Sequence, residues 1–189
     1  MLHIGVDFSI TSPCICFWNS SKTHLFENSE FFFLGSSKKT NFPENISFAE
    51  SSFSKDNSVR FSENAELLLA EIKKRLDKRV RYAIMLEGYS MGAKGRLFDI
   101  GEATGIFKYF LSQNSISPLI VAPSSIKKHA TGKGNANKFQ MLEKFLEINT
   151  SLRNSTWVTD LITEKRLQAP LPDIVDAFFI ANSYTVSYD

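Results

Sequence analysis

The stretch LHIGVDFS, residues 2–9, opens the chain with an apolar run that ends at an acid, Asp7. A second apolar run, Tyr82–Leu86, ends in the same way at Glu87. Both runs have the composition of buried strands bounded by polar residues. A carboxylate at the end of a buried strand is unfavourable unless a cation compensates its charge. The two strand ends therefore indicate a site that attracts positive charge.

Two further acids, Asp173 and Asp176, stand three residues apart in DIVDAFFIANSY, residues 173–184. Residues at i and i+3 share one helix face, and Pro172 suits the first turn of such a helix. This pair and the strand-end acids could gather four carboxylates around one point. Divalent cations relieve the repulsion at such a point, and hard oxygen ligands favour Mg²⁺, with Mn²⁺ as a substitute. The pattern outlines a metal-dependent phosphoryl-transfer site.

Each acid also has an ordinary structural explanation when it is considered alone. Asp7 could form a turn after its strand, and Glu87 could pair with Lys94 or Arg96. Acids in the first turn of a helix are favoured by the helix dipole for structural reasons alone. The specific feature is their order, because two strand-end acids are followed by D-x-x-D at the start of the final helix.

The remaining segments predict a single α/β domain over residues 1–189, a five-stranded mixed sheet with helices on both faces. The first three strands have the close spacing of an antiparallel meander. Residues 35–58 are rich in polar residues and predict a long, partly packed loop. The predicted strands are 2–9, 14–19, 24–34, 82–87 and 118–122, and the main predicted helices are 61–79, 97–113, 138–148 and about 172–184.

Charge is unevenly distributed along a chain whose net charge is only +2. Residues 73–138 hold thirteen Lys and Arg against four Asp and Glu, which predicts a surface for a polyanion. For the segment 73–81 the alternative is the solvated end of a helix. Cys14 and Cys16 are expected to be core residues without a mutual disulfide, and His and Cys lack zinc-ligand spacing. No signal peptide or membrane span is predicted, so we expect a cytoplasmic protein that is not secreted.

The motifs resemble those of the RuvC-type Holliday junction resolvases of the RNase H-like superfamily. The glycine-rich loop after Glu87 and the insert at 35–58 resemble those of the viral and phage members more than those of the bacterial enzyme. The DNA of such viruses and phages is processed in a host-cell compartment. The matching stretches are GVDFSITSP (5–13), IMLEGYSMGAKGRLFDIGEATGIFKYFL (84–111), VAPSSIKKHATGKGNANK (121–138) and PDIVDAFFIANSY (172–184). They resemble, in turn, the family's first strand, its catalytic Glu with the junction-probing loop and following helix, its DNA-facing basic segment and its closing helix.

The resemblance implies catalytic and metal-binding roles for Asp7, Glu87, Asp173 and Asp176, with Mg²⁺ as cofactor and Mn²⁺ as its substitute. The family's bacterial members carry a Phe that stacks at the junction crossover, three residues after the Glu. Here Ser90 holds that position, with Tyr89 beside it. The expected DNA-binding residues are Tyr89, Lys94, Arg96, Lys127, Lys128, Lys133 and Lys138.

The expected function is a homodimeric, Mg²⁺-dependent endonuclease that resolves four-way DNA junctions by paired symmetric nicks through two-metal-ion hydrolysis. A dimer is expected because two nicks are needed across a nearly twofold junction. One alternative is an RNase H-like nuclease that acts on hybrids, flaps or other branched intermediates. Another is a module that binds branched DNA without cleaving it.

Overall fold

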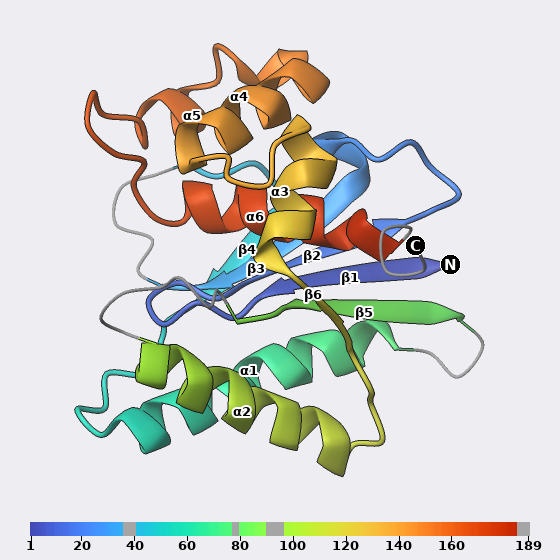
Figure 1. Cartoon of the computed structure of the whole chain (residues 1–189), viewed down its shortest axis with the longest axis vertical. Helices are drawn as coiled ribbons and strands as arrows, with labels where there is room; N and C mark the ends of the chain where they lie inside the picture. The colour runs from blue at the N-terminus through green and yellow to red at the C-terminus, as the bar shows by residue number, and fades with distance from the viewer. Residues whose placement is uncertain (36–40, 77–79, 90–96, 185–189) are drawn as a thin grey trace.

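A computed structural model describes residues 1–35, 41–76, 80–89 and 97–184. Within these ranges the chain forms a mixed six-stranded sheet between two layers of helices (Figure 1). The strand order across the sheet is β4-β3-β2-β1-β5-β6. The strands are β1 (Leu2–Asp7), β2 (Cys14–Asn19), β3 (Ser29–Leu34), β4 (Ile46–Ala49), β5 (Tyr82–Glu87) and β6 (Leu119–Val121).

The pairing confirms the antiparallel meander and the mixed α/β sheet. β1 pairs antiparallel with β2, and β2 pairs antiparallel with β3. β5 joins the other side of β1 in parallel, and β6 is parallel to β5. The strands β1 and β5 therefore lie next to each other in the sheet, although residues 8–81 separate them in the sequence.

The sheet has six strands rather than the five expected, because β4 lies inside the segment 35–58 that was predicted to be a loop. β4 pairs in parallel with β3, with Phe31 opposite Ile46 and Leu34 opposite Ala49. Of its four residues only Ile46 is buried, and four residues are too few for a pattern of apolar and polar residues to identify a strand. Backbone pairing with β3 creates this short edge strand.

Helices begin and end where local hydrogen bonds allow. α1 begins at Asn57, four residues before its predicted start, because the Asp56 carboxylate accepts hydrogen bonds from the backbone N–H groups of Ser58 and Val59. Asn137 and Gln140 form a reciprocal capping box at the start of α4. The helices are α1 (Asn57–Arg75), α2 (Leu97–Gln113), α3 (Pro123–Thr131), α4 (Lys138–Ile148), α5 (Thr156–Thr159) and α6 (Leu171–Ala181), with single 3₁₀ turns η1 (Phe26–Asn28) and η2 (Thr150–Leu152).

The two faces of the sheet bury separate hydrophobic cores. Ile4 and Val6 of β1 point to the face that α1 and α2 cover, and the alternate strand residues point to the opposite face. On that opposite face α6 lies directly on the sheet, with α3, α4 and α5 outside it (Figure 1). Cys14 and Cys16 belong to this second core as buried free thiols, as expected.

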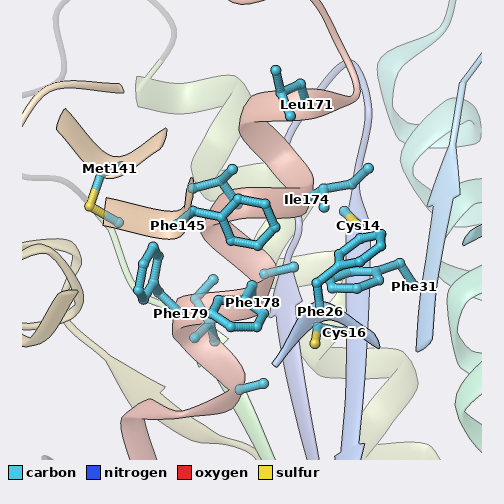
Figure 2. Packing of buried hydrophobic residues seen from close by; sticks show 14 of the residues in the cluster. Cys14, Cys16, Phe26, Phe31, Met141, Phe145, Leu171, Ile174, Phe178 and Phe179 are labelled. Atoms are coloured by element: carbon cyan, nitrogen blue, oxygen red, sulfur yellow. The ribbon is translucent and has the colours of Figure 1, made fainter. Parts of the chain in front are cut away.

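α6 is the central element of the second core. Ten of its eleven residues are buried, and a helix that is apolar on nearly all sides is suited to the interior of a domain. Figure 2 shows Ile174, Phe178 and Phe179 of this helix packed among Phe26 and Phe145. The rings of Phe145 and Phe178 meet edge to face with centroids 5.0 Å apart. This packing fixes the position of the helix and of the acids it carries.

None of the helices in the described part of the chain has the length and apolar character that a membrane span requires.

Candidate active site

Asp7 and Glu87 lie side by side at the carboxyl ends of two neighbouring parallel strands, β1 and β5. Val6 of β1 is opposite Leu86 of β5, and each strand ends at the next residue. Because successive side chains alternate between the two faces, both acids belong to the face that α6 covers. Parallel pairing of two strands distant in sequence therefore brings the two carboxylates to the same end of the sheet.

α6 supplies the other two acids from its first two turns. Asp173 is 5% exposed, and Asp176 follows one turn later on the same side of the helix. The helix lies unusually close to β1 because Gly5 has no side chain: a Cβ there would stand 2.7 Å from the Cα of Ala181. It would also meet the carbonyl oxygen of Ala177. This close approach lets α6 carry both of its acids to the end of β1.

A cavity of about 330 Å³ opens where these elements meet. The cavity combines charged and apolar walls. Acids come from the sheet and from α6, lysines from α3 and α4, and apolar residues from the β1–β2 turn and α2. Its lining includes all four predicted acids, Asp7, Glu87, Asp173 and Asp176, together with Phe8, Ser9, Ile100, Thr104, Lys127, Lys138 and Met141.

The electrostatic state of the acids is that of a crowded, desolvated group. Burial raises the pKa of Asp7 well above its usual range, and the charges of Asp173, Glu87 and Asp176 raise it further. Burial and the charge of Glu87 raise the pKa of Asp176 to about 7. Burial also raises the pKa of Asp173, and a hydrogen bond from Ser12 opposes this rise. The protein's own cationic groups therefore do not supply enough positive charge to neutralise the four carboxylates.

Two lysines compensate part of this charge. Lys127 of α3 and Lys138, the first residue of α4, line the same cavity. Burial raises the pKa of Glu87, and the ammonium groups of both lysines oppose that rise. The lysines thus face the acids closely enough to interact with them.

The donor set fits hard divalent cations such as Mg²⁺ and Mn²⁺. The described cavity lining contains four carboxylates and neither thiol nor imidazole, a composition that suits these ions. Across the described ranges, no three His, Cys, Asp or Glu side chains are already grouped as ligands of one ion. A bound cation would therefore have to draw the carboxylates inward, and the raised pKa values of the acids are the physical reason why it would be favoured.

The other predicted DNA-binding residues are distributed differently. Lys128 and Lys133 are exposed on α3 and in the turn that follows it, outside the cavity lining. Tyr89 is 39% exposed, and the Lys108 ammonium of α2 lies 5.4 Å from the centre of its ring. The predicted residues Lys94 and Arg96 lie outside the described residues.

The structure adds residues to which the sequence pattern assigned no role. The hydroxyl group of Ser12 donates a hydrogen bond to Oδ2 of Asp173 at 2.5 Å. Phe98, in the first turn of α2, has 88% of its surface exposed. The only sequence signal for the first contact is the pair of serines, Ser9 and Ser12, directly after the strand-end acid. The helical period places Phe98 opposite the buried face of Ala103, Phe107 and Leu111, but an exposed position alone indicates no role.

Comparison with known proteins places the fold. No protein-family model matches the sequence, and no curated protein matches it either. Among solved structures, RuvC of Thermus thermophilus superposes with a TM-score of 0.56 over 98% of this chain and 93% of its own, at 13% identity. T. thermophilus RuvC in complex with a Holliday junction substrate superposes with a TM-score of 0.55 over the same shares, at 14% identity.

The chain therefore has an RNase H-like α/β fold. Within that class it has the fold of RuvC, which confirms the predicted resemblance at the level of the fold. A nearer relation to the viral and phage members stays a prediction.

Proposed function

We propose that the protein is a divalent-metal-dependent endonuclease that resolves four-way DNA junctions. The observation that carries this proposal is the convergence of Asp7, Glu87, Asp173 and Asp176 on one cavity within a fold shared with RuvC. Acids from two strands and a distant helix meet there at a cost in desolvation and repulsion. A site of that kind is hard to explain by stability alone, and perturbed titratable groups in a cleft are typical of functional sites.

The four carboxylates would hold Mg²⁺ or Mn²⁺, and Lys127 and Lys138 would bind the phosphate that enters the cavity. When bound, two such ions supply activation of water and neutralise charge on the departing 3′-oxygen. Phe8, Ile100 and Met141 form an apolar wall of the cavity beside the acids. Cleavage of this kind leaves a 5′-phosphate and a 3′-hydroxyl.

DNA recognition would rest on the basic surface around the cavity. Lys127, Lys128, Lys133 and Lys138 belong to α3, to α4 and to the turn between them. Contacts of lysine with phosphate carry no sequence information, so they suit recognition of a branched shape. Tyr89 follows the Glu87-bearing strand by two residues, where its ring could stack on an exposed base. The enzyme would act as a homodimer, because resolution of a junction needs two symmetric nicks.

A panel of labelled substrates tests this function. The protein is incubated with a four-way junction, an RNA–DNA hybrid, a flap and a linear duplex, in Mg²⁺ and in chelator, with the Asp7→Asn variant as control. Paired symmetric nicks in the junction, dependent on metal and lost in the variant, support the proposal. Preferential cleavage of the hybrid or flap replaces it with an RNase H-like or flap nuclease. A shifted but uncut junction in all conditions replaces it with a branched-DNA-binding module.

A further inference from the structure

Ser12 and Asp173 form a buried contact between the two ends of the chain. Ser12 lies in the turn between β1 and β2, and Asp173 lies in the first turn of α6. The hydroxyl group of Ser12 donates to Oδ2 of Asp173 at 2.5 Å, and the two residues are 3% and 5% exposed. A buried hydroxyl group that donates to an ionised carboxylate, the form that would ligate a cation, makes a stronger bond than a neutral pair.

The turn is itself arranged to present this hydroxyl group. The backbone N–H of Ser12 donates to Oγ of Ser9 at 3.2 Å, and the Ser9 hydroxyl group also hydrogen-bonds Asp173. Ser9 lines the cavity, whereas Ser12 does not. Both serines therefore hold the Asp173 carboxylate, and Ser12 does so from outside the cavity lining.

We propose that Ser12 is a positioning residue, which holds Oδ2 of Asp173 so that Oδ1 is the oxygen directed toward a cation in the cavity. An aspartate side chain rotates about two bonds, and repulsion from Asp7 and Asp176 would otherwise turn the carboxylate away from them. The buried hydroxyl group removes that freedom. Ser12 lies outside the cavity lining, so its effect on the site is exerted through Asp173. This inference rests on the metal-binding role of the acids given above.

The first measurement is Mn²⁺ binding by titration calorimetry on the whole protein without DNA. We expect Ser12→Ala to weaken Mn²⁺ affinity by about 10- to 100-fold, the range typical for loss of a residue that orients a metal ligand. Ser12→Thr keeps the hydroxyl group and should restore most of the affinity. Ser29→Ala is the matched control, because it removes another buried hydroxyl group, hydrogen-bonded to the carbonyl of Leu25 at 2.9 Å in a different part of the sheet. The control should bind Mn²⁺ as the wild type does.

A double-mutant cycle separates positioning from general damage to the fold. If Ser12 acts through Asp173, Ser12→Ala should cause no further loss of Mn²⁺ affinity in an Asp173→Asn background. Should the alanine variant be too unstable to assay, Ser12→Cys fills the same space with a much weaker donor and serves in the same cycle. In parallel, the Mn²⁺ concentration that gives half-maximal junction cleavage should rise in Ser12→Ala, with thermal unfolding as a check on folding.

The outcomes separate this inference from the proposed function. Wild-type protein that neither binds Mn²⁺ nor cuts a junction overturns the metal-dependent function, and the positioning role falls with it. Wild type that binds and cuts, with Ser12→Ala equal to it in Mn²⁺ affinity, overturns the role of Ser12 alone. Losses that add fully in the double mutant also overturn it, because they place the effect of Ser12 outside Asp173.

Discussion

Gly5 and Ala181 stand in direct backbone contact between β1 and α6. A Cβ at Gly5 would lie 2.7 Å from the Cα of Ala181 and would also meet its backbone nitrogen. No flexible side chain is available there to move aside, since the neighbouring atoms belong to the helix backbone. The absence of one methyl group on β1 therefore sets how near α6, with Asp173 and Asp176, approaches Asp7.

Gly5→Ala is therefore expected to push α6 away from the sheet. Overpacking of a close interface costs typically about 1–3 kcal/mol, and occasionally more, so the thermal unfolding midpoint should fall clearly. Metal-dependent cleavage should fall too, because two acids move with the helix. Gly105→Ala is the control: its Cβ would meet nothing within 4 Å, and replacing a mid-helix glycine stabilises by roughly 0.5–1 kcal/mol. Equal unfolding midpoints for the two variants would contradict the close-contact argument.

Asp7→Asn should abolish cleavage and preserve or tighten junction binding. The neutral amide cannot replace a carboxylate as a metal ligand of the same strength, and it removes a negative charge from beside the DNA. The measurement pairs a gel-shift titration with a cleavage time course on the same junction. Cleavage close to the wild-type rate would remove Asp7 from the catalytic set.

The metal-free protein should lose stability as the pH rises. Burial raises the pKa of Asp176 to about 7 from an ordinary value of 3.8, so the fold prefers its protonated form. The stabilisation is fully present below about pH 4 and is lost as the pH rises through 7, with a slope of at most about 1.4 kcal/mol per pH unit for one group. Thermal unfolding in chelator between pH 5 and 8 measures this loss, and Mn²⁺ should restore stability most strongly above pH 7.

The comparison that reports on Asp176, together with its coupling to Asp7 and Glu87, is the difference in stability between the wild type and Asp176→Asn. Burial lowers the pKa of His3 and lowers that of His24 to about 3. The stability that these histidines contribute to the fold is therefore lost as the pH falls, the direction opposite to that of Asp176. Both histidines are present in both proteins and cancel in the difference. A difference that does not change across this pH range would refute the raised pKa.

Lys127→Ala and Lys138→Ala should each weaken junction binding without regard to sequence. Removal of one phosphate-binding lysine should reduce the slope of log affinity against log salt by about one unit. Lys22→Ala is the control, because Lys22 follows β2 near Asn19, which pairs with Leu2 at the opposite end of β1 from Asp7. An unchanged slope in both cavity variants would show that these lysines do not bind DNA phosphate and only compensate the charge of the acids.

Tyr89→Ala should reduce resolution of an intact junction much more than that of a pre-nicked junction, which already opens easily. Stacking of a base on an aromatic ring is worth about 1–3 kcal/mol by alanine substitution. Tyr89→Phe keeps the ring, and with it the contact to the Lys108 ammonium, so it should retain most of the rate. Comparable losses on both substrates would assign the Tyr89 ring to packing and make the exposed Phe98 the next candidate.

The sequence by itself determined the elements whose period is local and strong. α2 and α4 have the predicted bounds, 97–113 and 138–148, and β5 has its predicted bounds of 82–87. The strand-end positions of Asp7 and Glu87 follow from the same patterns, because an apolar run that ends at an acid is visible without any partner. The pairing of Asp173 with Asp176 needed only helical spacing.

The tertiary structure decided what depends on contact between distant segments. β4 exists because β3 offers backbone partners to four residues that carry little pattern of their own. The hydrogen bond from Ser12 to Asp173 joins residues 161 positions apart, and the serines that follow Asp7 do not by themselves identify their partner. In the sequence Gly5 is an ordinary strand residue, and only the packing of α6 against it shows why a side chain would not fit there. Local periodicity specifies which face a side chain takes, whereas the distance between two elements is set only when their backbones meet.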